Sequence, residues 1–546
     1  MSAHHMIRSL LTVGLLLTTG VLPHVSADDT APRTPQAPTA VPGHQTLNVE
    51  GWTVHVSDQL KLDQPVSTET ALRLLEAQLK EVVRVIPVEP LARLREVPLW
   101  LSPTPAGFGP TAEYHPDAGW LRDHERDPAM AKAIQFTNIP NFPAEIKRMP
   151  VMVLHELAHA YHDRVLGFDF PEIRQAYDRA MAAGLYDKVT ELASGVEKKA
   201  YAATNHKEYF AELTESYFGV NDFYPANRTQ LRQHDPQMCD LLGRVWKVTT
   251  QTTPDAARDP YVVKPPPADM KLPAFYQKYV EAHGYPIVSS GRVNDYALKE
   301  AAYIVDIMLA KRPDVRKAMI DSGSRLIVEA YDEFSTDIPE YAQMTPKDYW
   351  DARARGFGGS QHDPVCSCAE ENVLGYPGDP YGTESILIHE FAHNIHLRGM
   401  IRVDPEFDKR VKAAYDAAMQ EKLWAGKYAA VNHHEYFAEG VQSWFNNNRS
   451  FDHDHNHVDT RAELREYDPR LAALCEEVFG DTVLEYTKPI SRLTGHLAGY
   501  DPSTCPEFTW PERLQKVRSD IRKQAQDRSD KATGENTASP KKADKP

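Results

Sequence analysis

This chain has fewer positive than negative residues. Its 546 residues include 61 Lys and Arg against 77 Asp and Glu, which gives a formal net charge of −16. An acidic surface repels phosphate groups, so we expect neither nucleic acid nor an anionic membrane as a partner. Apolar runs long enough to span a bilayer are also missing beyond the N-terminus. We therefore expect no membrane association once that N-terminal segment is removed.

The N-terminal segment has the three parts of a secretory signal. Arg8 supplies a short positive start, residues 10–22 form an apolar core, and Val25-Ser26-Ala27 is a small-residue cleavage site. A membrane anchor is the alternative, but the apolar run is short for a span. No cysteine follows the cleavage site, which argues against a lipid anchor. The pattern predicts a signal peptide over residues 1–27 and a secreted or periplasmic protein.

Cysteine is also rare, with five in the whole chain. Export permits disulfides, and four of the five (Cys366, Cys368, Cys475 and Cys505) lie in the second half. We expect two bridges there, of connectivity that sequence cannot specify, and a small buried Cys239. A metal or redox role for Cys366 and Cys368 is the alternative, but no second such pair exists to complete a site.

The length suits two or three domains, and proline-rich stretches suggest where they divide. Within the first domain, residues 68–84 have helical periodicity and residues 97–102 have the pattern of a strand. The tail is charged, with one possible short helix and expected disorder from about Ser529. The predicted organisation is a linker at 28–46, a domain at 47–252, a linker at 253–273, a domain at 274–500, and a largely disordered tail at 501–546.

A five-residue motif occurs twice. The copies are His155-Glu156-Leu157-Ala158-His159 and His389-Glu390-Phe391-Ala392-His393. Residues four apart share one face of a helix, so each histidine pair can hold one metal ion. The glutamate beside the first histidine then lies near the open metal position, where a general base acts on water. The motif predicts a metal-dependent hydrolase.

The two copies belong to a longer repeat, because other matched segments follow in the same order and at nearly constant offsets. We therefore expect two tandem, helix-rich α+β domains, each with a small mixed sheet. The matched segments are 51–54 with 284–287, 176–181 with 414–419, 208–212 with 435–439, and 231–236 with 464–469.

Two histidines leave a zinc ion one ligand short, since a catalytic site uses three protein ligands and a water. Glu208 and Glu435 open the repeated Glu-Tyr-Phe-Ala-Glu segments and are the candidate third ligands. Glu212 and Glu439 share the same helix faces, so they are candidates to accept a hydrogen bond from a ligand histidine.

Several of these positions also have a simpler structural role open to them. An asparagine stands three residues before each candidate glutamate, so each glutamate could instead close a capping box at its helix start. Tyr201 and Tyr428 stand seven residues before Glu208 and Glu435 and could donate to an oxyanion or simply pack. The histidines three residues after each motif, at 162 and 396, are predicted to support the ligands or to pack. The insertion at 452–457 is interpreted as a solvated loop, with an extra metal site as the alternative.

Over about the last half of each block, these motifs resemble the zinc metallopeptidase domain of the anthrax lethal factor family, zincins with a glutamate as third ligand. The resemblance implies one Zn²⁺ per domain and two per chain. Unlike the lethal factor itself, this chain is duplicated and shows no toxin-delivery region, so toxicity does not follow. The implied roles are metal ligation by His155, His159, Glu208, His389, His393 and Glu435, catalysis by Glu156, Tyr201, Glu390 and Tyr428, and support of the site by Glu212 and Glu439.

The predicted activity is that of a secreted metalloendopeptidase acting on a peptide or protein, with an edge strand aligning the substrate. Residues 134–137 and 371–374 are the candidate edge strands. A zinc amidase acting on cell-wall peptides and a non-catalytic protein stabilised by zinc are the alternatives. A structural zinc needs no general base, so the glutamate in each motif favours catalysis. The oligomeric state does not follow from the sequence.

Overall fold

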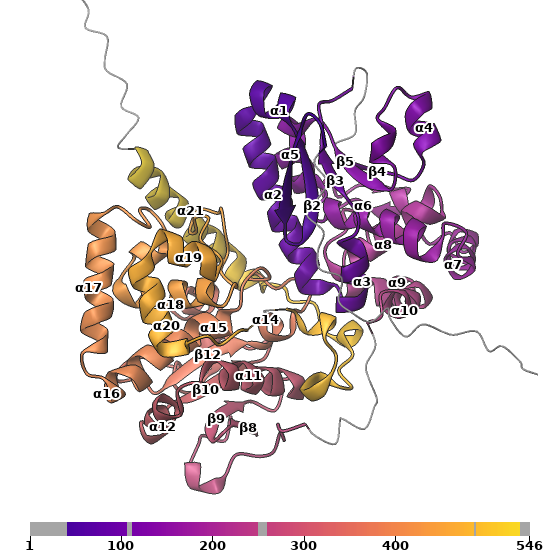
Figure 1. Cartoon of the computed structure of the whole chain (residues 1–546). Coiled ribbons are helices and arrows are strands. Elements are labelled where there is room, and N and C mark those ends of the chain that lie inside the picture. The colour runs from indigo at the N-terminus through magenta and orange to yellow at the C-terminus, as the bar shows by residue number, and fades with distance from the viewer. Residues whose placement is uncertain (1–40, 106–111, 249–258, 485–486, 535–546) are drawn as a thin grey trace, which may run out of the picture. The chain divides into compact units, whose positions relative to one another are not determined.

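The computed structural model describes residues 41–105, 112–248, 259–484 and 487–534 (Figure 1). The predicted signal peptide and nearly all of the first linker lie outside these residues, although the first strand already begins at His44. The final helix, α21 (Glu512–Gly534), is longer than the short helix expected in the tail, and its Leu514 is fully buried beside Phe334 and Ala352. The predicted domain boundaries stay predictions.

Each half of the described chain contains one five-stranded mixed sheet, and the two sheets have the same topology. The first has the order β1-β2-β3-β5-β4, and the second has the order β8-β9-β10-β12-β11. In each, the two central pairings are parallel and the two outer pairings are antiparallel. The strands are β1 (His44–Val49), β2 (Trp52–Ser57), β3 (Leu99–Leu101), β4 (Ala112–His115), β5 (Ala133–Phe136), β8 (Lys278–Ala282), β9 (Tyr285–Ser289), β10 (Arg325–Glu329), β11 (Gly356–Phe357) and β12 (Val365–Ala369).

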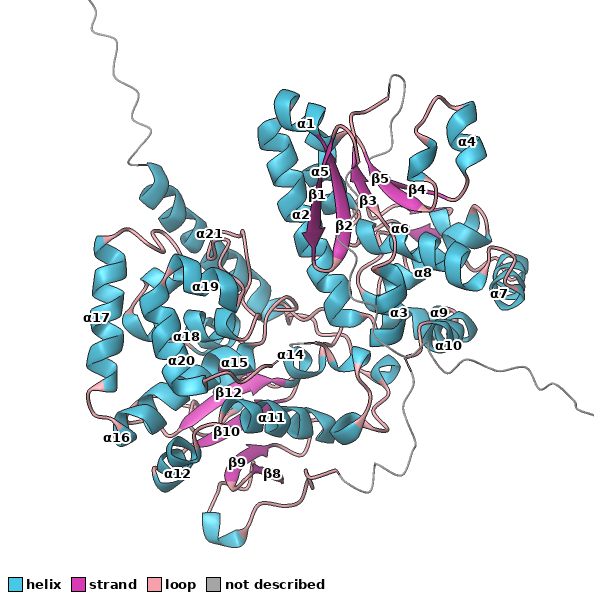
Figure 2. Cartoon of the chain, in the orientation of Figure 1, coloured by secondary structure: helices cyan, strands magenta, loops and turns pink. Residues whose placement is uncertain are grey.

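Helices make up most of the remaining structure (Figure 2). The first half contains α1 (Asp58–Asp63), α2 (Pro65–Val85), α3 (Val88–Leu94), α4 (Ala118–Asp123), α5 (Phe142–Arg148), α6 (Met152–Tyr161), α7 (Pro171–Ala182), α8 (His206–Phe218), α9 (Arg228–His234) and α10 (Pro236–Val245). The second contains α11 (Asp295–Met308), α12 (Pro313–Asp321), α13 (Lys347–Arg353), α14 (Glu370–Leu374), α15 (Ile386–Asn394), α16 (Ile401–Val403), α17 (Phe407–Gln420), α18 (His433–Trp444), α19 (Arg461–Tyr467) and α20 (Pro469–Phe479). The α+β class expected for both halves is confirmed.

The apolar residues of each half collect into a large core of their own. The predicted helix at 68–84 is the central part of α2, whose buried residues follow a helical stripe. The predicted strand at 97–102 contains β3, which is buried throughout. Both predictions are confirmed because local periodicity and burial agree at these positions.

The predicted disulfides are wrong, since all five cysteines are free and buried. Cys366 and Cys368 are two apart on β12 and therefore point to the same face of the sheet, into the core of the second half. Cys475 and Cys505 belong to the same core, where a cysteine acts as a small apolar residue. Cys239 is buried as expected.

The predicted edge strands are also wrong. Residues 134–136 lie in β5, which is an interior strand of the first sheet, and the edge beside it is β4. Residues 371–374 lie in the helix α14, and the corresponding edge of the second sheet is β11. Strand order is set by pairing between distant segments, which local residue patterns do not encode.

No helix in the part of the chain that the structure describes combines the length and the apolar character that crossing a membrane requires.

Candidate metal centres

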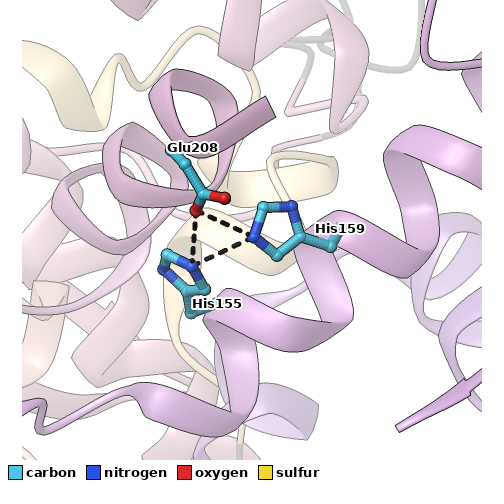
Figure 3. A group of neighbouring side chains, drawn as sticks. All are labelled: His155, His159 and Glu208. Atoms are coloured by element: carbon cyan, nitrogen blue, oxygen red, sulfur yellow. Dashed lines mark hydrogen bonds and ion pairs between the residues drawn. The ribbon is translucent and has the colours of Figure 1, made fainter. Parts of the chain in front are cut away.

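In the first half, two helices bring three metal-binding side chains to one point (Figure 3). Helix α6 carries His155 and His159 on one face, and α8 carries Glu208. The two histidine Nε2 atoms are 3.1 Å apart, and Glu208 Oε2 lies 3.1 Å from His159 Nε2 and 3.3 Å from His155 Nε2. Ligands about 2.1 Å from a tetrahedral zinc are separated by about 3.4 Å, so this donor set fits the ion.

The second half repeats the arrangement on α15 and α18. His389 and His393 have their Nε2 atoms 3.2 Å apart, and Glu435 Oε2 lies 3.1 Å from the first and 3.2 Å from the second. The six ligand candidates from the sequence therefore form two separate groups of three.

The electrostatics of both groups favour a bound cation. Burial raises the pKa of the Glu208 carboxyl, but hydrogen bonds to His155 and His159 outweigh it, so the net pKa is lowered. Burial likewise opposes the charge of Glu435, and the two histidines beside it hold its pKa low. Each glutamate is thus an anion facing two imidazole nitrogens, as a metal ligand must be.

The asparagine before each third ligand caps the helix without competing for the glutamate side chain. Asn205 Oδ1 accepts hydrogen bonds from the backbone N–H groups of Lys207, at 2.8 Å, and Glu208, at 3.1 Å. Asn432 does the same for His434 and Glu435. The glutamate carboxylates point to the histidines instead, so the cap fixes the start of the helix that carries the ligand.

The hydrogen bonds behind the first ligand histidine go to residues that the sequence reasoning missed. His155 Nδ1 donates to Glu215 Oε1 at 2.6 Å, whereas Glu212 lies 3.7 Å away. Such a bond leaves the lone pair of Nε2 free for a metal. Glu215 stands seven residues after Glu208, two helical turns along the same face, and that spacing is the signal that would have pointed to it.

The matching position in the second half is Gln442. His389 Nδ1 donates to Gln442 Oε1 at 2.8 Å, and Glu439 lies 3.5 Å away. The Gln442 amide in turn donates to Glu384 Oε2 at 3.1 Å. The predicted supporting residues Glu212 and Glu439 are thus beside the ligand histidines but are not their nearest acceptors.

The insertion at 452–457 reaches this environment. His455 is only 5% exposed, and its ring lies between Glu439, 3.4 Å from Nε2, and Asp452, 2.7 Å from Nδ1. Burial opposes protonation of His455, but these two carboxylates outweigh it and raise its pKa to about 10. The description as a solvated loop is therefore wrong for His455, which balances the charge of Glu439.

The two general-base candidates have different neighbours. Glu156 Oε2 accepts a hydrogen bond of 2.8 Å from the backbone N–H of Tyr114, a residue of the edge strand β4. Glu390 lies against β11, where a Cβ at Gly356 would come within 3.2 Å of Glu390 Cγ. Burial raises the pKa of Glu390. In both halves the base therefore adjoins the edge strand.

The two tyrosines begin short turns beside the centres, η4 (Tyr201–Ala203) and η9 (Tyr428–Ala430). The Tyr428 ring lies 6.2 Å from the His389 ring, whereas Tyr201 is 50% exposed. Burial and the neighbouring glutamate raise the pKa of each hydroxyl, so both tyrosines are protonated donors at neutral pH.

Each ligand helix continues into a π-helical turn that begins at or beside the third histidine: η3 (His162–Leu166) and η8 (Ile395–Met400). His162 is buried against Phe168 and Phe210, and burial lowers its pKa to about 3. His396 is fully buried with its Nε2 3.1 Å from Asp408. The two histidines occupy the same position of the repeat, but His162 packs against two phenylalanines whereas His396 lies beside a carboxylate.

Comparison with known proteins identifies no family for this chain. The sequence matches no family model, and no curated protein matches it significantly. Among solved structures, the PRO-PRO endopeptidase PPEP-2 from Paenibacillus alvei matches with a TM-score of 0.25 and 16% sequence identity, over 35% of this chain and 97% of that one. The resemblance to the lethal factor family stays a prediction.

Proposed function

We propose that the chain is a zinc-dependent metalloendopeptidase with one catalytic centre in each half. The observation that carries the proposal is the combination, made twice, of three converging metal ligands with a glutamate on the same helix and an edge strand beside it. A site that only stores or holds a metal needs neither the glutamate nor the strand.

Zinc, when bound, would polarise the scissile carbonyl and lower the pKa of an attacking water. Glu156 and Glu390 would take the proton of that water and pass it to the leaving amine. Glu215 and Gln442, bonded to Nδ1 of His155 and His389, would hold these histidines in the tautomer that ligation requires. Tyr201 and Tyr428 would donate to the oxyanion of the tetrahedral intermediate.

A peptide substrate would be aligned by addition to β4 or β11, the edge strands nearest the two bases. This mode of binding reads the peptide backbone, so it suits a protein or peptide of extended conformation. The N-terminal residue pattern supports export, and we propose that the protein acts outside the cytoplasm.

Two alternatives remain distinct from this proposal. A zinc amidase of cell-wall peptides would use the same ligands and base but would cleave an amide outside an ordinary peptide chain. A zinc-stabilised binding protein would retain both metal ions and cleave nothing.

The test combines zinc content per chain with cleavage of casein or a mixed peptide pool. It uses the wild type, His159→Ala and His393→Ala, with Glu156→Gln and Glu390→Gln as variants that keep every ligand. We expect each histidine variant to lose one zinc and the cleavage due to its half, and each glutamine variant to lose cleavage with zinc retained. Zinc without cleavage of any peptide would favour the amidase or binding alternative. A folded protein that binds no zinc would refute the metal centres.

A further inference from the structure

A third group of metal-binding side chains lies in the second half, next to the ligand Glu435. It consists of Asp408 from the start of α17 and of His433 and His434 from the start of α18. Asp408 Oδ1 lies 3.1 Å from His433 Nε2 and 3.6 Å from His434 Nε2, and the ligand atoms of all three residues lie within 4.8 Å of one another. These separations approach those of the two centres described above.

A fully buried histidine is directed into the same group. His396 is 0% exposed, and among the described residues neither of its ring nitrogens makes a well-aligned hydrogen bond. Its Nε2 nevertheless lies 3.1 Å from Asp408 Oδ1, and its ring centre lies 5.4 Å from that of His434. Burying an imidazole without a full hydrogen-bond partner costs free energy, which an aligned hydrogen bond from His396 to an oriented Asp408 carboxylate would offset.

The first half shows what the same position looks like without such a group. His206 corresponds to His433, but its Nε2 donates to the backbone oxygen of Phe168 at 2.8 Å. Lys207 takes the place of His434, and its ammonium lies 4.0 Å from the centre of the Phe168 ring. An ammonium has no lone pair for a metal. The repeat has therefore acquired or lost the three-ligand group in one copy only.

We propose that Asp408, His433 and His434 bind an accessory divalent transition-metal ion such as Zn²⁺, with His396 positioning the carboxylate. Two imidazoles and one carboxylate suit zinc and its first-row neighbours. The three side chains are 21–36% exposed, compared with 9–18% for the ligands of the adjacent centre. Water reaches the accessory ion more easily, so it exchanges faster and is lost first to a chelator. His434 directly precedes Glu435 in the sequence. A metal ion bound at the accessory site would therefore connect α17 to the start of α18, the helix that carries the third ligand.

The experiment measures Zn²⁺ bound per full-length chain by equilibrium dialysis against rising Zn²⁺, followed by elemental analysis. Wild type should hold one zinc more than Asp408→Asn and one more than His434→Lys, which installs the residue of the first half. The matched control Lys207→His should add none, because the neighbouring His206 Nε2 is already bonded to the backbone oxygen of Phe168. His453→Ala should lose none, because the exposed His453 contacts Asp454 outside the group.

The expected result is a difference of one zinc that appears at the highest free Zn²⁺ and disappears first on chelation. Co²⁺ substitution gives a second readout, because wild type should show one set of absorption bands that both variants lack. Equal zinc content in wild type and both variants, with all three folded, would overturn the proposal. The test measures the difference in zinc content between wild type and variant, which does not depend on how many zinc ions the His155 and His389 centres hold. Failure of the accessory site is therefore distinguishable from failure of the proposed catalytic centres.

Discussion

The two candidate metal centres have the same candidate ligands but different charges behind them. In the first half, His155 is backed by Glu215, with Glu212 buried close by, and burial raises the pKa of both acids. In the second half, the neutral Gln442 replaces the acid, and Glu439 is paired with His455. The two halves have thus kept the same candidate metal-binding atoms but differ in the residues that bond to the first histidine from behind. Direct ligation demands specific donors, whereas charge behind a ligand can be balanced in several ways.

The largest expected effect is the loss of kcat on removing the proposed general base of each half. Glu156→Gln should abolish the activity of the first centre and Glu390→Gln that of the second, each by roughly 10²–10⁴-fold in kcat, because a positioned general base is lost. Assays of each variant in a background where the other base is already removed measure one centre at a time. Zinc content serves as the control and should not change. Undiminished cleavage in the double variant would contradict the assignment of the bases.

A pH-dependent difference should follow from His455, which has no counterpart in the shorter loop of the first half. Its pKa is raised to about 10 in the folded protein, so its stabilising effect is full below its unfolded pKa of about 6.5 and is lost as pH rises towards 10. His455→Asn should cost up to roughly 5 kcal/mol at pH 6, and the cost should shrink at high pH. Denaturant unfolding of both proteins across this range measures it. A cost independent of pH would show that the protonated ring is not what stabilises the loop.

The two tyrosines should differ in effect because they differ in burial. Tyr428→Phe should lower kcat of the second centre by roughly 10²-fold, with KM little changed, as expected for a lost oxyanion donor. Tyr201→Phe should cost the first centre less, because a hydrogen bond from the half-exposed Tyr201 hydroxyl is weakened by water. Single-centre backgrounds are again required, and equal small losses in both would favour a packing role for the two rings.

The smallest effect concerns the residue behind the histidine. Glu215→Gln should weaken zinc binding at the first centre by about tenfold, because a carboxylate makes the ligand imidazole more basic than an amide does. Gln442→Glu should change the second centre in the opposite direction. Competition with a chromogenic chelator measures both affinities. Unchanged affinity in both exchanges would mean that the hydrogen bond matters and its charge does not.

Local sequence patterns were enough to predict the two groups of converging side chains, the repeat and the helix over residues 68–84. His155 and His159 are one helical turn apart, and Glu208 lies in a segment that recurs, so neither required knowledge of the tertiary structure. Glu215 and Asp408 were missed, and His455 was wrongly interpreted as solvated, because each contacts its partner across the fold, from another helix or from an inserted loop. Only the spacing of Glu215 from Glu208 gave a local signal. The prediction of the edge strands was wrong for the same reason, because the position of β4 and β11 at the sheet edges depends on pairing between distant segments.

The hydrogen bond from Tyr114 to Glu156 has a consequence for the order of events in the first centre. A backbone N–H on the edge of β4 bonds well to only one acceptor at a time. A peptide carbonyl that added to the strand at this position would compete with Glu156 for this N–H and would release the Glu156 carboxylate. In the resting protein the base is therefore held by the strand on which we propose the substrate docks, and arrival of the substrate would itself set the base free.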